Sequence, residues 1–499
     1  MIYIYQFGRL ERNFYENVRF KINSYETEYP LSSLALGEYF KEIDKKEVKN
    51  IILYPISLFL NFEVLNNDSK LTQVHRESLY NLLNSKYMDY KKLSIFFEDL
   101  TKEYYSSEAQ HIILYSLGNY KYEENELHFD TTLDDLSLQI FVEMYNTIST
   151  DQDIELYLDI SSGLNLYIAA LIEAAKNFWT FFNLQNWGKK KISIFFVFSE
   201  PIRKNSIHNV YYNNEIKYRY FFECPIEKNS IDSICNYIDE VLFSNYSIQS
   251  KERTTQKEEL KQILEELILT YNALKYNIPL FFLTFQLPEP EKLRKIVNQI
   301  IGNLYSLMYN RNLKSSPKLD RNKIMRVILS LAFFIGVKSI IDETIIHNQQ
   351  IDNQNLKAYF EKIYNTLGLN LNKIYLSSEL SIIQSKIVKI LREINDEELK
   401  ENLLNVTIDY FTLESIDNII KLEENVKEKV KQVIENGVKE FDPKVFYSRN
   451  FFAHAGFEKN ATLIKIIKES LNRGNKNVRF ILSYKKEAID KIKEELYKL

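Results

Sequence analysis

An arginine and a histidine near the C-terminal end of the sequence have side chains and a spacing that suit phosphate chemistry. The segment 449–456 reads RNFFAHAG, so Arg449 precedes His454 by five positions and Asn450 follows the arginine. A planar guanidinium can hold a phosphate through paired hydrogen bonds, and an imidazole can move a proton near neutral pH. Cleavage of RNA without a metal fits these groups. Arg449 would bind the developing charge, His454 would serve the 2′-hydroxyl as general acid or base, and Asn450 would hydrogen-bond the phosphate or position the partner histidine.

Helix signals surround this motif. Asp442 suits an N-cap and Pro443 a first helical position, while Ala455-Gly456 suits a helix end, so we expect a helix over 443–454. Five residues of ideal helix leave the two side chains ~140° apart with a rise of ~7.5 Å. One helix is therefore a poor site. Two copies that meet across a symmetric dimer could place an Arg and a His from each chain around one phosphate, so we expect a homodimer or a higher assembly of dimers.

The same spacing occurs a second time, between Arg203 and His208. That pair lies in a polar, irregular segment after Pro201 with no helix to hold it, and we interpret it as structural. The four other histidines have no partner at metal-ligand spacing: His75, His111, His128 and His347. Two cysteines, Cys224 and Cys235, support neither a zinc site nor a disulfide framework. We expect no metal site.

A metal-dependent nuclease is the competing chemistry. Its signature would be carboxylates gathered at strand ends. Asp134-Asp135 lies in an expected loop or helix start, and the PEPEK segment at 288–292 is typical of a helix entry. Neither pattern supports this alternative well.

A second polar segment follows an apolar run earlier in the chain, where 159–165 reads DISSGLN. Gly163 allows positive φ or close backbone approach. Ser161 and Ser162 offer hydroxyls and free N–H groups at a helix start, where anions are favoured. An ordinary capped helix start explains the same letters. Neither a Walker A sequence nor GxGxxG is present, which disfavours an ordinary ATP or NAD site.

Five apolar runs divide the first ~220 residues at spacings that leave room for crossover helices: 2–5, 51–60, 112–117, 154–160 and 192–198. Runs this apolar are typical of buried parallel strands, and 163–182 is a candidate crossover helix. We expect a hairpin over 209–225, with its turn at Asn213-Asn214. Ligands of open parallel sheets bind beyond the carboxyl ends of the strands. The candidate ligand-binding residues are those that follow the runs: Gln6, Phe7, Gly8, Arg9, Ser57, Ser116, Gly118, Asp159, Ser161, Ser162, Gly163 and Asn165.

Helical periodicity dominates after about residue 250, over 256–275, 289–309, 320–346, 378–394 and 412–436. Asp320 is a candidate N-cap and Gly437 a candidate C-cap, and 478–484 could form a short strand. We expect an α/β Rossmann-like domain at 1–225, a helical connector at 226–315 and an all-α domain at 316–499.

Composition is that of a globular protein, with 499 residues, 45% apolar and 26% charged. The net charge of −4 disfavours a protein that coats long nucleic acid. The first residues lack the features of a signal peptide, and the apolar stretch 327–341 contains Lys338 and is too short to span a membrane. We expect a cytoplasmic protein with no membrane partner, and a core helix at 327–341.

The order of elements and the two motifs resemble the ancillary ribonucleases of type III CRISPR systems. These join a CRISPR-associated Rossmann-fold (CARF) domain to a HEPN domain, and are also called the DxTHG-motif family. Asp159 to Gly163 stands where that motif belongs, with Ser161 in place of Thr and Ser162 in place of His, and Asn165 matches a common following Asn. RNFFAH at 449–454 matches the HEPN pattern of Arg, a polar residue and then His.

The resemblance implies that a CARF dimer binds a cyclic oligoadenylate, with the tetra-adenylate favoured over the hexa-adenylate. Binding would shift the HEPN dimer to an active state that cuts single-stranded RNA without a metal or cofactor, leaving 2′,3′-cyclic phosphate ends. Ser162 in place of His disfavours degradation of the activator by the CARF domain itself. The alternative is a CARF-type sensor that acts as a regulator or scaffold without nuclease activity.

Overall fold

The computed structural model describes residues 1–10, 16–60, 71–85, 89–104, 109–122, 125–187, 189–203, 206–216, 226–243, 250–309, 318–345, 351–422, 426–436, 438–467 and 478–499. The chain forms two compact units. Unit 1 comprises Met1–Glu223, Tyr237–Arg253 and Arg294–Phe333, and unit 2 comprises Cys224–Asn236, Thr254–Leu293 and Phe334–Leu499. The predicted domain limits at 225 and 315 stay predictions.

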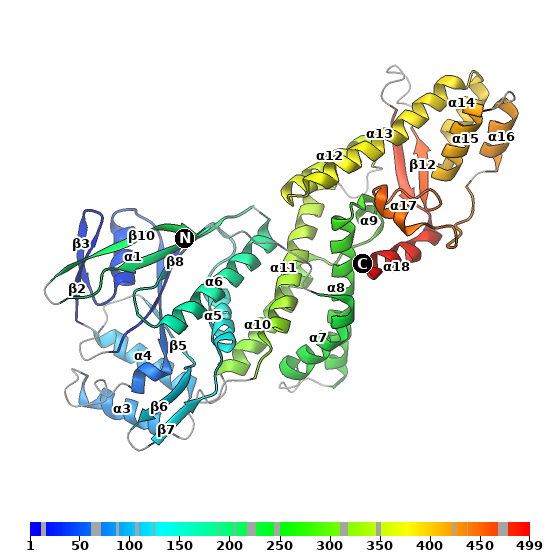
Figure 1. The fold of residues 1–499 in the computed structure, drawn as a ribbon. Helices are drawn as coiled ribbons and strands as arrows, with labels where there is room; N and C mark the ends of the chain where they lie inside the picture. Colours follow the sequence, from blue (N-terminus) through cyan, green and yellow to red (C-terminus); the bar gives the residue numbers. More distant parts are fainter. Residues whose placement is uncertain are drawn as a thin grey trace. The chain divides into compact units, whose positions relative to one another are not determined.

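Unit 1 is built on an eight-stranded sheet of order β3-β2-β10-β9-β8-β1-β4-β5 (Figure 1). Its strands are β1 (Ile2–Phe7), β2 (Val18–Ile22), β3 (Tyr25–Tyr29), β4 (Val48–Pro55), β5 (Gln110–Leu114), β8 (Ile154–Asp159), β9 (Ile192–Ser199) and β10 (Ile207–Ile216). The five predicted apolar runs correspond to five adjacent strands, β5, β4, β1, β8 and β9, each of which pairs in parallel with the next. Burial on both faces explains their near-continuous apolar sequence.

The predicted hairpin at 209–225 is wrong in its described part. β10 continues through Asn213 and Asn214 as one strand and pairs antiparallel with β9, with an irregular register between Tyr211 and Asn214. The two asparagines therefore accommodate an irregularity within a strand, which local sequence does not distinguish from a turn. Residues 217–225 lie outside the described part of the chain.

Helices cover both faces of this sheet. Alternate side chains of a strand point to opposite faces. Ile2 and Ile4 of β1 pack in a core with α1 (Ser32–Glu42), while the Tyr3 hydroxyl accepts a hydrogen bond from the Ser149 N–H, just after α5 (Leu133–Thr147). α5 lies beside α6 (Asn165–Asn186), the predicted crossover helix (Figure 1). The other elements near the sheet are a 3-10 segment (Ile56–Leu60), α3 (Gln73–Asn84), α4 (Tyr90–Tyr104) and the hairpin of β6 (Gly118–Tyr122) and β7 (Asn125–Phe129).

The rest of the chain is mostly helical, so the predicted fold class of an α/β region followed by a helical region is confirmed. Its helices are α7 (Ile231–Ile238), α8 (Ser250–Lys275), α9 (Pro279–Thr284), α10 (Pro290–Tyr309), α11 (Arg321–Thr344), α12 (Asn353–Thr366), α13 (Asn370–Glu393), α14 (Glu397–Asn405), α15 (Tyr410–Leu422), α16 (Val426–Glu435), α17 (Ser448–Ala453) and α18 (Ile489–Lys498). Asp320 caps α11 as predicted, because its carboxylate accepts the Lys323 N–H at 3.1 Å. Gly437 lies outside the described residues.

Unit 2 also contains an antiparallel sheet of order β11-β12-β13, so the region expected to be all-α at 316–499 is mostly helical but not all-α. Its strands are β11 (Thr407–Asp409), β12 (Thr462–Ile466) and β13 (Phe480–Tyr484). β13 confirms the short strand expected at 478–484. The single helix expected over 412–436 is wrong, because α15 and α16 are separate helices that pack against each other.

α11 is the helix that contains the most apolar stretch of the sequence. By length and composition it could span a membrane, but 83% of its apolar window is buried inside the protein. It is therefore a core helix, as expected for 327–341.

Candidate ligand edge and ribonuclease motif

The carboxyl ends of β1 and β8 carry a buried hydrogen-bond network. Gln6 and Asp159 are register partners on these neighbouring strands. The Ser32 hydroxyl, at the start of α1, donates to the Asp159 carboxylate at 2.6 Å and accepts from the Gln6 amide at 3.0 Å. The Gln6 carbonyl oxygen accepts the Ser33 N–H at 3.1 Å. The network fixes the strand ends and the start of α1 as one rigid edge.

Asp159 is completely buried. Burial raises the pKa of its carboxyl group, and hydrogen bonds from Ser161 and Ser32 oppose part of that rise. The Ser161 N–H donates to the carboxylate at 2.9 Å, and the Ser161 hydroxyl accepts the Ser199 N–H at 2.8 Å. Asp159 and Ser161 therefore hold the turn that follows β8.

The turn itself opens to solvent. Gly163 has φ +73 and is exposed, and Asn165 is exposed as the first residue of α6. Ser162 is half-buried, and its hydroxyl accepts the Leu164 N–H at 3.5 Å. The left-handed conformation at Gly163 is the positive φ that the sequence predicted.

A second group of hydroxyls lies beyond β4 and β5. The Ser57 N–H donates to the Ser116 hydroxyl at 2.6 Å, and the Ser57 hydroxyl lies 3.3 Å from that of Tyr167, on α6. Tyr167 also accepts the Leu117 N–H at 3.0 Å. Burial raises the pKa of Tyr120, whose hydroxyl interacts with Ser57 and Tyr167. Hydroxyls that both donate and accept suit a polar ligand such as a nucleoside.

The other predicted ligand residues have roles in packing, hydrogen bonding or turn geometry within the fold. Phe7 is buried, with its ring 5.7 Å from that of Tyr167. A Cβ on Gly8 would lie 2.1 Å from the buried Tyr54 ring, so only glycine fits there. Arg9 donates from its guanidinium to the Pro30 carbonyl at 2.7 Å. Gly118 has φ +91 and begins β6.

The Arg/His motif lies on a helix shorter than predicted. α17 begins at Ser448, not at Pro443, so the expected helix over 443–454 is wrong in its first half. Asp442 instead forms a turn, in which its carboxylate accepts the Lys444 N–H at 2.8 Å and its carbonyl the Val445 N–H at 3.1 Å. Asn and Asp favour such turns as strongly as helix caps.

The helix ends where the sequence predicted. Ala455 and Gly456 both have positive φ, at 52 and 77. A Cβ on Gly456 would lie 2.6 Å from the Tyr484 hydroxyl and 2.8 Å from Ile278, so this glycine also allows close packing. His454 is thus the C-cap residue, just beyond the last helical turn.

The motif side chains face solvent while the helix is anchored behind them. Arg449, Asn450 and His454 are exposed, and Phe451 is fully buried. The Ser448 hydroxyl donates to the Glu495 carboxylate at 2.6 Å. Burial raises the pKa of Glu495, but hydrogen bonds from Ser448, Lys491 and Lys498 outweigh it and hold that pKa at about 2.

His454 has an acidic partner on another helix. Its Nδ1 lies 3.2 Å from the carboxylate of Glu379, on α13. The glutamate side chain is 14% exposed and the histidine side chain 47%. Glu379 precedes His454 by 75 residues, so no spacing in the sequence pointed to it.

A buried ion pair fixes the segment before α17. Lys485 Nζ lies 3.0 Å from the Asp409 carboxylate, and both side chains are almost fully buried. Lys485 also donates to the Lys439 carbonyl at 2.8 Å, and Asp409 accepts the Lys439 N–H at 3.0 Å. A buried ion pair and two hydrogen bonds therefore hold the chain that leads into the exposed motif.

The second Arg/His pair is structural, as predicted. His208 is buried on β10, and its Nε2 accepts the Arg203 N–H at 3.3 Å. Within the described ranges, no group of three or more His, Cys, Asp or Glu side chains could hold a metal.

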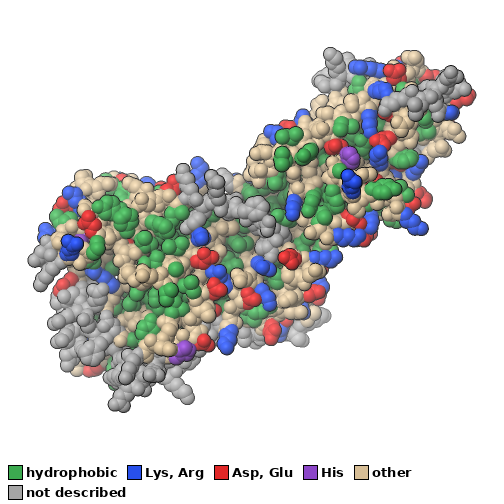
Figure 2. Space-filling view, in the orientation of Figure 1, with side chains coloured by type: hydrophobic (Ala, Val, Ile, Leu, Met, Phe, Trp, Pro, Cys, Tyr) green, Lys and Arg blue, Asp and Glu red, His purple; other side chains and the backbone are tan. Residues whose placement is uncertain are grey.

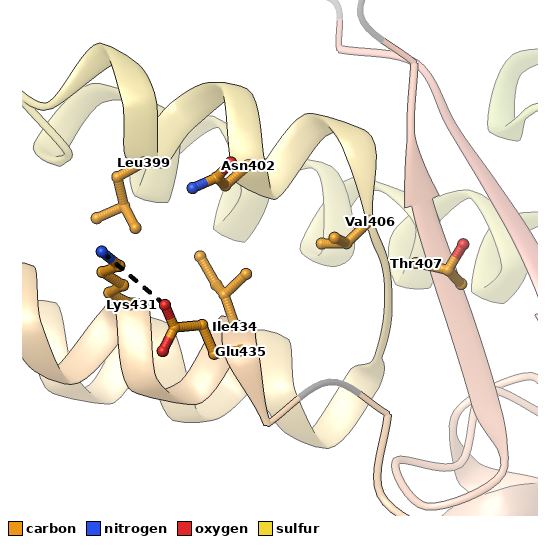
Figure 3. Close-up of a pocket in the computed structure, with 7 residues that line it drawn as sticks. All are labelled: Leu399, Asn402, Val406, Thr407, Lys431, Ile434 and Glu435. Atoms are coloured by element: carbon orange, nitrogen blue, oxygen red, sulfur yellow. Dashed lines mark ion pairs between the residues drawn. The ribbon is translucent and has the colours of Figure 1, made fainter.

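An open cavity of about 570 Å³ lies between α14 and α16, away from every predicted site residue (Figure 3). It is lined by Leu399, Asn402, Val406, Thr407, Lys431, Ile434 and Glu435. Lys431 and Glu435 pair with each other across 3.9 Å on its wall. The cavity plays no part in the site described above.

Comparison with known proteins shows what the N-terminal region is similar to. Residues 2–201 match the family model described as the CARF domain of the CRISPR system endoribonuclease Csx1. The N-terminal region is therefore similar to a Csx1 CARF domain. The DISSGLN turn and the hydroxyls of Ser57, Ser116 and Tyr167 lie within the matched residues.

A curated relative extends the similarity beyond the CARF domain. The chain is 26% identical over 370 residues to the CRISPR system endoribonuclease Csx1 of Methanocaldococcus jannaschii, covering 67% of this chain and 68% of that protein. The predicted resemblance to CARF–HEPN proteins of type III CRISPR systems is confirmed, and the helical C-terminal region is consistent with a HEPN domain.

Proposed function

We propose that this protein is a ligand-activated endoribonuclease of a type III CRISPR system, cutting single-stranded RNA in the cytoplasm. The observation that carries the proposal is the exposed Arg449/His454 pair on an anchored helix, in a chain whose N-terminal region is similar to a Csx1 CARF domain. The name of the archaeal relative, an endoribonuclease, supports it.

The chemistry needs a base, an acid and a cation around one phosphate. Arg449 binds the phosphate through its guanidinium fork. His454 moves the proton as the 2′-hydroxyl attacks the phosphorus and the 5′-oxygen leaves, and Asn450 hydrogen-bonds a phosphate oxygen. The products carry a 2′,3′-cyclic phosphate and a 5′-hydroxyl, and the reaction proceeds in EDTA.

A second copy of the chain completes the site. α13 exposes four large apolar side chains, Leu371, Ile374, Tyr375 and Ile382. On an ideal helix they lie within an arc of ~100°, and Glu379 borders it. Figure 2 shows hydrophobic side chains on the surface over α12 and α13. A one-sided apolar stripe on an exposed helix favours burial against a partner, and a two-fold axis there would bring two Arg/His pairs together.

The activator binds the CARF edge. The exposed turn at Gly163 and Asn165, with the hydroxyls of Ser57, Tyr120 and Tyr167, offers mixed donors and acceptors suited to the sugars and bases of a cyclic oligoadenylate. The tetra-adenylate is the proposed form. It activates because it binds the active arrangement of the dimer more tightly than the inactive one.

Substitution of the motif tests this function. In the presence of cyclic tetra-adenylate, Arg449→Ala and His454→Ala are expected to slow cleavage of a labelled single-stranded RNA by about 10²–10⁴-fold. Because both side chains are exposed, the melting temperature and activator binding should stay unchanged. Arg203→Ala, in the structural pair of equal spacing, is the matched control and should cleave at the wild-type rate. Wild-type cleavage by the Arg449→Ala/His454→Ala double variant would contradict the proposal.

A further inference from the structure

The contact between Glu379 and His454 has the features of a built interaction. α13 is a 24-residue helix, anchored on either side of Glu379 by the buried Leu376, Leu380 and Ile383. α17 has only six residues, and a helix so short has little stability of its own. The contact with Glu379 on α13 therefore holds the histidine ring in place, which the short helix α17 alone would not do.

The charged groups around the contact are paired elsewhere. Lys386, one helical turn beyond Ile382 on α13, and Lys459 both pair with Glu414 on α15. Burial raises the pKa of Tyr410, and the charges of Glu414 and Glu379 raise it further. Among the described side chains, the ion-pair partner of Glu379 is His454.

The atoms in contact determine what the imidazole can do. Glu379 Oε2 lies beside Nδ1, so the carboxylate accepts a hydrogen bond from Nδ1–H. That bond fixes the tautomer and the ring plane, and it leaves Nε2 as the nitrogen that exchanges a proton with substrate. A carboxylate beside the ring also stabilises the imidazolium that forms when Nε2 takes a proton.

We propose that Glu379 is a positioning residue that orients His454 for proton transfer. This inference rests on the proposed ribonuclease function. The alternative is an ordinary surface ion pair, which would contribute little to stability and nothing to the rate of RNA cleavage.

Two substitutions separate orientation from charge. At saturating RNA and cyclic tetra-adenylate, Glu379→Ala is expected to lower kcat about 10–100-fold, with KM within about twofold, which is less than the loss from His454→Ala. The kcat of Glu379→Gln should lie between those of wild type and Glu379→Ala. Its amide oxygen still accepts a hydrogen bond from Nδ1–H, but its negative charge is gone. Glu393→Gln, exposed on the same helix, is the control and should match wild type.

The separate measurement of kcat and KM gives a readout that a merely structural role would not move. A lower kcat at an unchanged KM, partly recovered in Glu379→Gln, would show that the side chain acts on proton transfer and not on RNA binding. The isosteric variant should keep the wild-type melting temperature, so a folding defect in Glu379→Ala would leave the inference testable.

The outcomes distinguish failure of the positioning role of Glu379 from failure of the proposed ribonuclease function. Wild-type kcat in both Glu379 variants, with cleavage by His454→Ala slowed by at least about 10²-fold, would overturn the positioning role and leave the ribonuclease standing. Wild-type cleavage by His454→Ala would instead overturn the ribonuclease assignment itself, and the role of Glu379 with it.

Discussion

The two polar segments that carry the proposed function are built in opposite ways. At the end of β8, Asp159 is fully buried, and its carboxylate holds Ser32 and Ser161 in place. On α17, Arg449 and His454 are exposed, and the residues that hold the helix lie behind it. A ligand-sensing edge must transmit binding through a rigid network, whereas a nuclease motif must reach a large substrate.

The difference predicts where substitutions act. Changes in the buried network should cost stability, because they leave polar groups unpaired in the interior. Changes in the exposed motif should cost activity alone. Both tryptophans of the sequence, Trp179 and Trp187, lie in or next to α6 in unit 1. Tryptophan fluorescence therefore reports unfolding of the unit that contains the ligand edge.

Loss of the Asp159 carboxylate is expected to have the largest effect on stability. Asp159→Ala leaves the Ser32 hydroxyl and the Ser161 N–H without their acceptor. The free energy of unfolding of unit 1 should fall by about 2–3 kcal/mol, measured by urea unfolding with tryptophan fluorescence. Asn450→Ala, in the exposed motif, should change it by less than about 0.5 kcal/mol. Equal effects of the two substitutions would remove the contrast between the segments.

A buried glutamate makes the stability of unit 1 depend on pH. Burial raises the pKa of Glu143 on α5 from 4.5 to about 7, and a hydrogen bond with Tyr309 opposes part of the rise. The folded state therefore holds the proton more tightly than the unfolded chain. Its stabilisation is complete below pH 4.5 and is lost as pH rises through about 7, by about 3 kcal/mol at most.

Glu143→Gln tests that sign directly. The variant should lose most of the decline in unfolding free energy between pH 4.5 and 7. A residual slope is expected from Asp159, whose pKa burial also raises. Urea unfolding at several pH values, followed by tryptophan fluorescence, measures both slopes. A variant that declines as steeply as wild type would show that Glu143 does not prefer its protonated form in the fold.

The parallel core of the fold could be predicted because its signals are local. Five apolar runs became five strands, and the turn at Gly163 adopts the predicted positive φ. The hairpin at Asn213-Asn214 and the helix start at Asp442 were wrong for one shared reason. Asn and Asp satisfy turns, strand irregularities and helix caps alike, and packing decides which one forms.

The candidate site could be predicted only where its residues are neighbours in sequence. Arg449, Asn450 and His454 lie within one segment, and so do Asp159 to Asn165. Ser32, Tyr167 and Glu379 were missed because they reach the sites through tertiary contacts. The three have no motif of their own, since a serine, a tyrosine or a glutamate in a helical segment is ordinary in sequence.

RNA cleavage measured with and without activator is the decisive test of both ligand activation and the role of His454. Wild-type protein and His454→Ala are incubated with labelled single-stranded RNA in EDTA, alone or with cyclic tetra-adenylate or cyclic hexa-adenylate. We expect strong stimulation of the wild type by the tetra-adenylate, 2′,3′-cyclic phosphate products, and cleavage by His454→Ala that is at least about 10²-fold slower under every condition. Equal wild-type rates with and without both activators, or cleavage only after magnesium or manganese is added, would contradict it.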